Sequence, residues 1–358
     1  MGSAGTPPLA DSLAAVVGLI RRFVVLGDHD LTALALWTAH THAADAATTT
    51  PYIGITSAEK RSGKTRLLEV LELVVRSPLP TANISDAALY RAIGALAPTL
   101  LFDEIDAIFG AKARDREDLR GMLNAGYRQG ACVMRMGGAR MTDLERFPVF
   151  CPKVFAGIGD LPDTIADRSI RIRLQRRTRA EPVERFRRRE VVGDSEAIRT
   201  ALEAAMSALH ARLAGDRPSL PDELDDRAQD GWEALLAIAD RAGRDWPERA
   251  RAAAIALSGP TAREDQSLQT RLLSDLQAVF AESDVDRFKT ADLVARLAAI
   301  EESPWGDYFG RWITAHQLSK LLQPFAIRTM PVYVDGITVR GYKREQFVEV
   351  WERVLDER

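Results

Sequence analysis

The chain has little of what metal-bound or disulfide-stapled proteins rely on. Its 358 residues include two cysteines, Cys132 and Cys151, and five histidines, and none of these stands in a zinc-ligand spacing. Two isolated cysteines give no disulfide framework, which suits a reducing compartment, so we expect a cytoplasmic protein. His40 and His42 lie two residues apart in a helical pattern. We interpret them as ordinary core or surface residues.

The sequence also has no long apolar run, and we expect no secretory leader. No apolar run reaches the roughly 18–20 residues that a membrane-spanning helix needs, so no membrane association is expected. Residues 1–10 lack the basic start and apolar core of a signal peptide. The formal net charge is only −3. A nucleic-acid partner would therefore be recognised by local basic patches, such as the arginine-rich segment 166–189.

What the sequence does contain is a phosphate-binding motif. The apolar run 51–56 leads into a loop with Gly63, Lys64 and Thr65, which then opens a helix. Gly63 lets backbone N–H groups turn toward phosphate oxygens, Lys64 reaches the β and γ phosphates, and the Thr65 hydroxyl ligates Mg²⁺. A chance match on a basic turn is the alternative, and the strand–loop–helix setting disfavours it. The residues predicted to bind ATP are Ala58 (where glycine is commoner), Glu59, Lys60, Arg61, Ser62, Gly63, Lys64, Thr65 and Arg66.

A second motif follows about forty residues later. The β-prone run 99–102 ends in Asp103 and Glu104. We expect Asp103 to hold Mg²⁺ and Glu104 to polarise the water that attacks the γ-phosphate. A solvated turn is the alternative for an isolated acidic pair. The pair favours ATP hydrolysis over phosphoryl transfer to a metabolite, and it disfavours a small-molecule kinase.

The order of elements predicts an α/β architecture with several parts, because 358 residues exceed one compact core. Strands that alternate with helices indicate a parallel sheet covered on both faces. We divide the chain into a helical preface at 1–48, a P-loop ATPase core at 49–178, a helical lid or linker at 179–283 and a C-terminal domain at 284–358. Residues 176–193 are interpreted as a connector.

Two hairpins carry the remaining predictions. Strand 131–136, a turn at 137–140 and a return at 144–150 form a hairpin inserted before the core strand 153–159. In the C-terminal domain, two helices precede strands that alternate about Asp335 and Gly336, a strong two-residue turn signal. Helix, helix, hairpin and final helix predict a winged helix-turn-helix. Such modules bind DNA more often than protein partners.

These residues resemble AAA+ ATPases, and more narrowly the superfamily-three and phage primase–helicase branch. The likeness rests on the phosphate loop, residues 102–104, the hairpin strand 133–136 and the segment 150–156. Residues 10–355 also look like the bacterial domain-of-unknown-function family 3631, found in replication proteins of phages and integrated elements. Three signatures carry that likeness: 33–42, 161–171 and 238–247.

The resemblance implies a homo-oligomeric ring, a hexamer in such motors, in which a neighbour's arginine reaches the γ-phosphate. Arg168 matches that position, and a salt bridge with Asp167 or Asp163 is its alternative role. Arg171 and Arg173, which share one face of the next strand, are the second choice. Relatives carry an asparagine as a γ-phosphate sensor where this chain has residues 157–160, Gly-Ile-Gly-Asp. The sensor is therefore unassigned.

The resemblance also implies DNA contacts. The inserted hairpin would point into the ring's pore, where Arg135 and Arg140, with Arg146 as a further candidate, follow the backbone of a single strand. Lys343 and Arg344 are the predicted contacts of the winged helix with duplex DNA. A primase or a replication initiator is an expected partner. The leading interpretation is a Mg²⁺-dependent ATPase that moves along or unwinds DNA, and the alternative is an ATP-dependent switch that binds DNA without processive unwinding.

Overall fold

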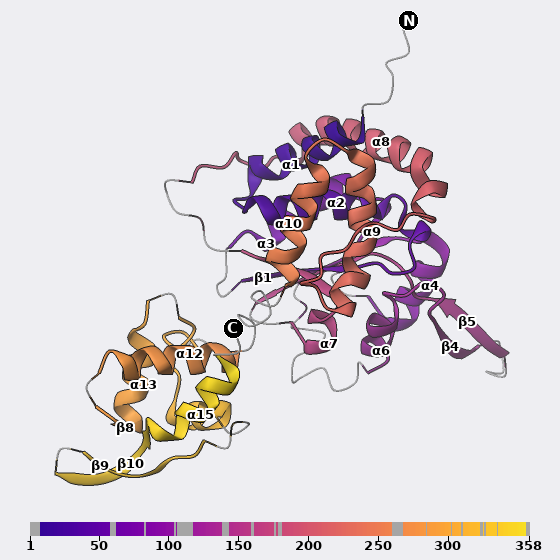
Figure 1. The fold of residues 1–358 in the computed structure, drawn as a ribbon. Helices are drawn as coiled ribbons and strands as arrows, with labels where there is room; N and C mark the ends of the chain where they lie inside the picture. The colour runs from indigo at the N-terminus through magenta and orange to yellow at the C-terminus, as the bar shows by residue number, and fades with distance from the viewer. Residues whose placement is uncertain are drawn as a thin grey trace, which may run out of the picture. The chain divides into compact units, whose positions relative to one another are not determined.

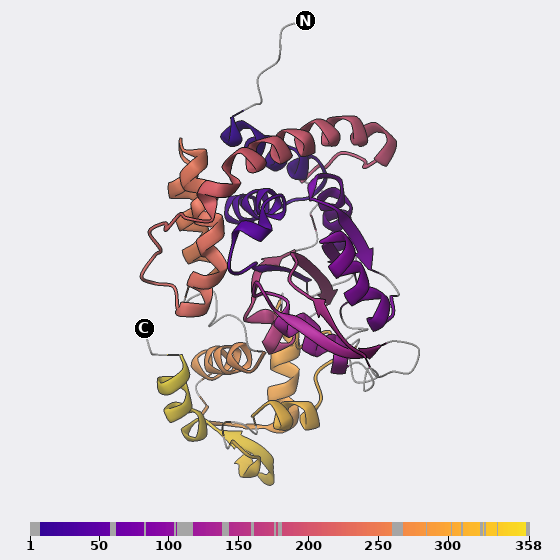
Figure 2. The same cartoon turned by 90° about the vertical axis from the view of Figure 1, so that its right-hand side faces the viewer.

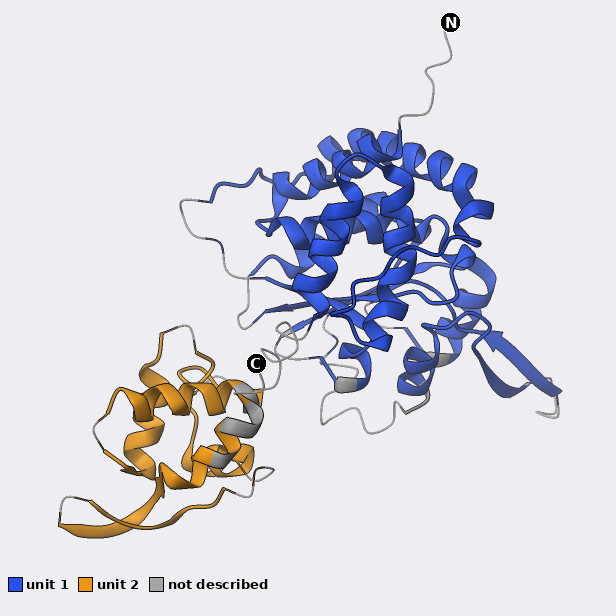
Figure 3. Cartoon of the chain, in the orientation of Figure 1, with its two compact units in different colours: residues 1–260 blue, residues 261–358 orange. Residues whose placement is uncertain are grey.

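The computed structural model of the chain describes most of its residues. They form two compact units, residues 1–260 and residues 261–358, which Figure 3 shows in blue and orange. Each unit is built around its own apolar core. The described residues are 8–57, 62–81, 84–103, 105, 117–137, 143–158, 161–174, 177, 181–259, 268–283, 285–301, 303–308, 311–322, 325, 327–334 and 336–355.

The first unit contains a five-stranded sheet in the order β2-β3-β6-β1-β7. All neighbouring strands pair in parallel. Parallel strands require long crossover connections, which here contain helices. Strand β1 is buried along its whole length, as a central parallel strand covered on both faces must be. The predicted α/β parallel-sheet architecture is confirmed. The strand bounds are β1 Tyr52–Ser57, β2 Pro78–Thr81, β3 Thr99–Phe102, β6 Lys153–Ile158 and β7 Ser169–Arg173.

Helices cover both faces of this sheet (Figures 1 and 2). Because side chains alternate along a strand, Ile53 and Ile55 of β1 join the core on one face, whereas Tyr52 joins the core on the other. The first face packs against α1 Leu9–Phe23, α2 Asp28–Thr41, α3 Lys64–Val74, α8 Arg188–Leu213, α9 Asp226–Ala242 and α10 Trp246–Ser258. The second packs against α4 Asp86–Leu96, α6 Glu117–Ala125 and the short α7 Asp163–Ala166. Within the described ranges, no helix has the length and apolar character to cross a membrane.

The N-terminal helices and the helices after the sheet share one core. Helices α1 and α2 pack with α8, α9 and α10, and the indole of Trp37 donates a 2.8 Å hydrogen bond to the carbonyl of Pro51 just before β1. A one-turn 3-10 helix, η1 (Ala44–Ala46), links α2 to this strand. Helix α8 begins at Arg188, inside the segment interpreted as a connector. The helical preface and the helical region 181–259 therefore lie on the same face of the sheet.

The inserted hairpin is a separate two-stranded antiparallel ribbon formed by β4 Cys132–Gly137 and β5 Asp143–Pro148. In Figure 1 it extends outward from the body of the first unit. Its register pairs Met134 with Arg146 and Met136 with Leu144. Strand β5 packs against α4 through Tyr90 and Phe147, whose ring centroids lie 5.2 Å apart. Among the described residues, the ribbon is thus fastened at its base and on one face.

The second unit has a three-stranded antiparallel sheet in the order β8-β10-β9, with helices around it. A capping box opens α14: the Thr314 hydroxyl accepts from the backbone N–H of Gln317, and the Gln317 amide oxygen accepts from the N–H of Thr314. Helix α12 contributes Leu272 and Phe280 to this unit's core, although the sequence placed it before the C-terminal domain. The bounds are α12 Leu268–Ala281, β8 Arg287–Lys289, α13 Thr290–Ala299, α14 Ala315–Leu322, β9 Met330–Val334, β10 Ile337–Lys343 and α15 Glu345–Val354.

Candidate nucleotide site

The phosphate motif lies where β1 ends and α3 begins. Gly63 precedes the helix with a φ of 99°, a left-handed conformation that glycine adopts at little cost. The turn leaves the first N–H groups of an 11-residue helix unpaired within the helix, and these groups with the helix dipole suit an anion. Of the predicted ATP-binding residues, Ala58, Glu59, Lys60 and Arg61 lie outside the described residues; Ser62, Gly63, Lys64, Thr65 and Arg66 lie within them.

Lys64 is held at the junction between the strand and the helix. Its ammonium group donates to the hydroxyl of Ser57, the last residue of β1, and lies 3.4 Å from the hydroxyl of Ser62. Ser57 and Ser62 are both buried. The sequence did not single out Ser57, although a hydroxyl residue at the end of an apolar strand is a usable signal. The lysine charge is thus positioned by two hydroxyls at the carboxyl edge of the sheet.

Thr65 and Asp103 meet at the same edge. The Thr65 hydroxyl, on the first turn of α3, lies 3.0 Å from Oδ2 of Asp103, the residue that follows β3. Strand β6 separates β1 from β3, so neighbouring strand ends bring two distant motifs together. Glu104 lies outside the described residues. Arg66, by contrast, turns to the side: it pairs with Glu69 and its guanidinium lies 4.3 Å from the ring centroid of Phe186.

This donor set fits a magnesium nucleotide. A hydroxyl and a carboxylate within hydrogen-bond distance are hard oxygen ligands, and Mg²⁺ binds few protein groups when substrate phosphates supply the remaining ligands. Among the described residues no cluster of three or more His, Cys, Asp or Glu could hold a metal ion by itself. A magnesium ion held by Thr65 and Asp103 would need further oxygen ligands, and the phosphates of a nucleotide could supply them.

Arg168 lies at the opposite edge of the sheet. It immediately precedes β7, whose first residue, Ser169, is aligned with Tyr52 at the amino end of β1, whereas the phosphate loop follows the carboxyl end of β1. Six strand residues at about 3.3 Å each separate the two edges by roughly 20 Å. Arg168 is therefore too far away to serve the phosphate loop of its own chain.

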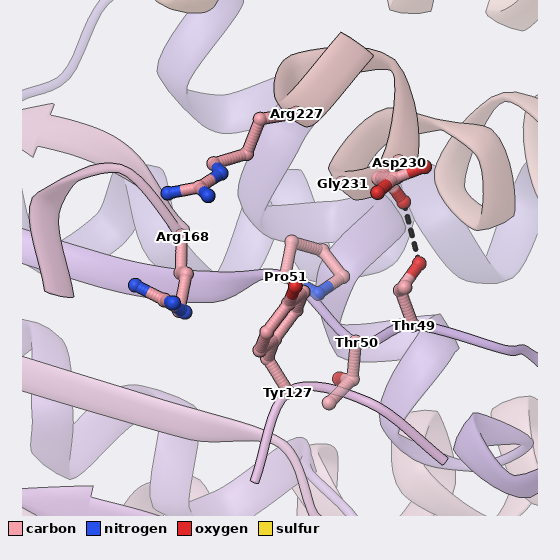
Figure 4. Close-up of a pocket in the computed structure, with 8 residues that line it drawn as sticks. All are labelled: Thr49, Thr50, Pro51, Tyr127, Arg168, Arg227, Asp230 and Gly231. Carbon is pink, nitrogen blue, oxygen red and sulfur yellow. Dashed lines mark hydrogen bonds between the residues drawn. The ribbon is translucent and has the colours of Figure 1, made fainter. Parts of the chain in front are cut away.

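The surroundings of Arg168 differ from a salt bridge with Asp167, one of the two partners considered for its alternative role. The side chain of Asp163, the other partner considered, lies outside the described residues. Its guanidinium donates to the carbonyl of Thr164 and lies 4.9 Å from the ring centroid of Tyr127. Its Nε has no hydrogen-bond partner within the part of the chain that the structure describes. Asp167 pairs instead with Arg227 of α9, at 2.9 Å. Figure 4 shows Arg168, Arg227 and Tyr127 around one small hollow.

The second-choice arginines lie on β7 itself. Ile170 and Ile172 are buried in the core, so Arg171 and Arg173 face the other way, as their alternation predicts. Strand β7 is an edge strand of the sheet and pairs with β1. Residues 157 and 158 of the sensor position end β6, and residues 159 and 160 lie outside the described residues.

The predicted hairpin contacts separate onto two faces. Arg135 lies on the face that packs against α4, with its guanidinium 5.5 Å from the ring centroid of Tyr90. The opposite face exposes Met134 (53%), Met136 (49%) and Leu144 (64%). Arg146 shares this exposed face, and its Nε lies 2.9 Å from the Cys132 sulfur. Arg140 lies outside the described residues.

The two basic residues predicted for DNA in the second unit stand at the start of α15. Lys343 pairs with Glu345 at 3.1 Å, which neutralises its charge locally. The backbone N–H of Arg344 donates to the carbonyl of Asp286, at 2.7 Å. The sequence missed the aromatic groups that this unit exposes, Trp312 at 66% and Tyr333 at 63%. The signal that the sequence offered was a tryptophan just before a capping box.

Comparison with known proteins places the chain in a family. Residues 173–354 match the family described as "Protein of unknown function (DUF3631)", and the chain belongs to it. Of the three sequence signatures, 238–247 lies inside the matched range and the two earlier ones lie outside it. A protein of Saccharopolyspora erythraea, described as "Uncharacterized 28.9 kDa protein in xis 5'region", is 39% identical over 182 residues, which cover 50% of this chain and 68% of that protein.

Solved structures resemble the chain only loosely. The apo C-terminal region of NrS-1 is 14% identical, covering 94% of this chain and 75% of that chain, with a TM-score of 0.35. The inhibitor-bound JCV helicase is 14% identical, covering 78% and 67%, with a TM-score of 0.29. Drosophila ORC bound to DNA is 11% identical, covering 97% and 92%, with a TM-score of 0.25. With TM-scores this low, these likenesses assign no activity.

Proposed function

We propose that this protein is a Mg²⁺-dependent ATPase that works on DNA as a ring-shaped helicase. The observation that carries the proposal is the contact between Thr65 and Asp103 at 3.0 Å, beside the ammonium group of Lys64. The three groups come from two motifs 38 residues apart, and the sequence predicted the same three for nucleotide and metal. Chance would not be expected to bring both motifs to one edge of the sheet.

Each residue of the site has a separate role. Bound ATP with Mg²⁺ would supply the γ-phosphoryl group that is transferred to water. Backbone N–H groups after Gly63 and the ammonium of Lys64 hold phosphate oxygens, which places charge where the transition state needs it. Thr65 and Asp103 would hold the metal, and the carboxylate of Glu104 would polarise the attacking water.

The placement of Arg168 and the phosphate loop at opposite ends of the parallel strands supports assembly into a ring. Arg168 lies at the amino ends of the strands and the phosphate loop at their carboxyl ends. The arginine of one subunit could therefore reach the phosphate loop of the next subunit, whereas it cannot reach its own. Such head-to-tail contacts use different surfaces of each subunit, and they close into a ring when the rotation permits. We propose a homo-hexamer in which Arg168 completes the neighbour's site.

DNA contact is assigned to two elements. The exposed face of the β4–β5 ribbon, with Arg146 and its apolar neighbours, would follow a single strand in the pore, and Arg140 at the turn would join it. The second unit has the element order helix, strand, helix, helix, two strands and helix, which supports a winged helix-turn-helix. It would dock on duplex DNA or on a replication partner such as a primase or an initiator.

A second candidate function is an ATP-dependent DNA-binding switch without processive unwinding. The sequence carries no asparagine at the sensor position 157–160, which favours this alternative. The exposed Trp312 and Tyr333 of the second unit also favour it, because they suit a docking role. The projecting ribbon favours the motor.

Strand displacement on a forked duplex decides between the two. ATP hydrolysis is measured in parallel with and without single-stranded DNA, and Lys64→Ala is the inactive control. Unwinding by the wild type but not by the variant supports the helicase. Stimulated hydrolysis without unwinding supports the switch, and no uptake of ATP in the presence of Mg²⁺ by any oligomeric form refutes both.

A further inference from the structure

Lys153 is a lysine with no exposed surface inside the first unit. It is the first residue of β6, and its relative exposure is 0%. Its ammonium group donates to three backbone carbonyls: Cys151 at 2.9 Å, Gly126 at 3.1 Å and Val149 at 3.3 Å. An ammonium has three N–H donors, so this set satisfies it completely. The face of Tyr52 lies 4.8 Å from Nζ and adds a favourable quadrupole.

The three acceptors belong to the root of the β4–β5 ribbon. Gly126 follows α6 on the way into the ribbon, and Val149 and Cys151 follow the ribbon on the way out. A side chain at Gly126 would place its Cβ 2.6 Å from Nζ, so glycine leaves the room that the ammonium occupies. Lys153 thus joins the incoming and outgoing chains to each other and to β6.

Additional hydrogen bonds hold the same root. Tyr52 of β1 donates from its hydroxyl to the carbonyl of Leu123, at 2.6 Å, and the N–H of Thr50 donates to the carbonyl of Tyr127, at 2.9 Å. Tyr127 is also the ring over which Arg168 lies. The root of the ribbon therefore contacts β6, the amino end of β1 and the Arg168 turn.

A buried ammonium is a costly way to fill space. Burial lowers the pKa of Lys153, because the charged form loses its hydration. A buried charge pair or hydrogen-bonded charge is often no more stable than well-packed apolar residues of similar volume. Removing the ammonium would leave three buried carbonyls without this donor. Such a group is better explained by a geometric task than by stability alone.

We propose that Lys153 is a positioning residue that fixes the root of the β4–β5 ribbon to the central sheet. Strand β6 lies between β3, which leads to Asp103, and β1, which leads to the phosphate loop. The ribbon then moves with the strands that carry the nucleotide site and does not swing independently. The consequence for DNA rests on the function proposed above, whereas the anchoring itself does not.

Amide hydrogen exchange tests the anchoring in the full chain. Lys153→Met keeps a long apolar side chain and removes the donor. Val154→Ala, at the next position of the same strand, is the control because Val154 points into the opposite core. We expect Lys153→Met to speed exchange roughly tenfold or more at amides whose bonds close the root, a loss of about 1.4 kcal/mol of local protection. These are the N–H groups of Thr50, Val149 and Cys151.

The opposite result is equally defined. Unchanged root exchange in Lys153→Met, or equal acceleration at the root in Val154→Ala at a matched loss of Tm, overturns the proposal. If Lys153→Met does not fold, Lys153→Gln replaces it, since the amide keeps two N–H donors and should show a smaller effect in the same amides.

A measurement of ATP hydrolysis then separates the anchoring role of Lys153 from the proposed coupling of the ribbon to the nucleotide site. Lys153→Met should retain basal ATP hydrolysis and lose its stimulation by single-stranded DNA, whereas Val154→Ala should keep both. A wild-type protein without ATP hydrolysis refutes the proposed function, and the exchange experiment still decides the role of Lys153. Full DNA stimulation in Lys153→Met, together with a loosened root, refutes the coupling of the ribbon to the nucleotide site.

Discussion

The hydroxyl of Thr65 lies 3.0 Å from the carboxylate of Asp103, although the two residues are 38 positions apart. This contact joins the start of α3 to the end of β3 across the intervening strand β6. If both oxygens ligate Mg²⁺, Thr65→Val should weaken Mg²⁺-dependent ATP binding at least roughly 10-fold, the size of the effect that loss of even an outer-shell metal partner has. Thr65→Ser keeps the hydroxyl and should bind like the wild type. Nucleotide affinity titrated against Mg²⁺ concentration checks this, and a Thr65→Val affinity equal to that of Thr65→Ser contradicts it.

Glu104→Gln should separate binding from turnover. The amide keeps the size of the side chain but cannot take the proton of the attacking water, so ATP affinity should stay within about threefold while hydrolysis falls roughly 100-fold or more. Equilibrium binding of ATP and release of inorganic phosphate are the measurements. Glu233→Gln on α9 is the control for the loss of one acid. Normal turnover in Glu104→Gln would place the base elsewhere.

Arg168→Ala should leave ATP binding intact and lower hydrolysis about 1,000-fold, because a trans-acting arginine stabilises charge in the transition state. A mixture of Arg168→Ala and Glu104→Gln subunits should regain activity, since some interfaces then combine an intact arginine with an intact acid. The comparison is the phosphate release of each variant alone. Failure to regain activity in mixtures that do assemble would count against Arg168 as the trans arginine.

The two faces of the β4–β5 ribbon predict different effects on DNA binding. Arg146→Ala, on the exposed face, should weaken single-strand binding and reduce the slope of log affinity against log salt by about one. Arg135→Ala, beside Tyr90 on the packed face, should change stability more than the salt slope. Fluorescence titrations at several salt concentrations distinguish the two. Equal slopes for both variants would remove the assignment of the exposed face.

His40 predicts a loss of stability on mild acidification. Complete burial lowers the pKa of His40 from 6.5 to about 4, so the unfolded state binds more protons between these values and the free energy of unfolding falls as the pH drops through them. The shift corresponds to roughly 3 kcal/mol. Urea unfolding should show that the free energy of unfolding of His40→Gln rises by about that amount relative to that of the wild type as the pH falls from 7 to 4.

Asp30 supplies a control of opposite sign. Burial raises its pKa from 3.8 to about 6, so the folded state binds more protons in this range and gains stability as the pH falls. Relative to that of the wild type, the free energy of unfolding of Asp30→Asn should therefore fall between pH 6 and pH 4. If His40→Gln and Asp30→Asn changed in the same direction, the assignment of the two protonation effects would be wrong.

Local sequence patterns were enough for several helix starts and for the strand and helix ends that form the nucleotide site. Helix α4 begins after Ser85, whose hydroxyl accepts from the N–H of Ala88, and α14 begins at the capping box formed by Thr314 and Gln317. The loop–helix junction at Gly63 and the strand that ends at Phe102 were also predictable, because each depends on neighbouring residues. Strand order and face were not, since pairing joins segments far apart in the chain.

The hairpin shows the limit of reading charges from sequence. The resemblance to helicases placed Arg135 among the candidates for DNA, but no local sequence pattern tells which face of a two-stranded ribbon packs against α4. The structure turns Arg135 toward Tyr90 and leaves Arg146 on the exposed face. For Lys343, the nearby Glu345 was visible in sequence, and its ion pair at 3.1 Å became clear only in the folded unit.

The sequence by itself determined the loop–helix junction at Gly63, the strand that ends at Phe102 and the paired strands of the two hairpins, because each follows from the conformational preferences and spacing of adjacent residues. Tertiary structure decided where those parts meet. It brought Thr65 to Asp103, put Arg168 at the other edge of the sheet and buried Lys153 under the ribbon root. The physical reason is that burial and strand pairing depend on contacts between residues distant in the chain. The free energy of such contacts is not contained in any local sequence pattern.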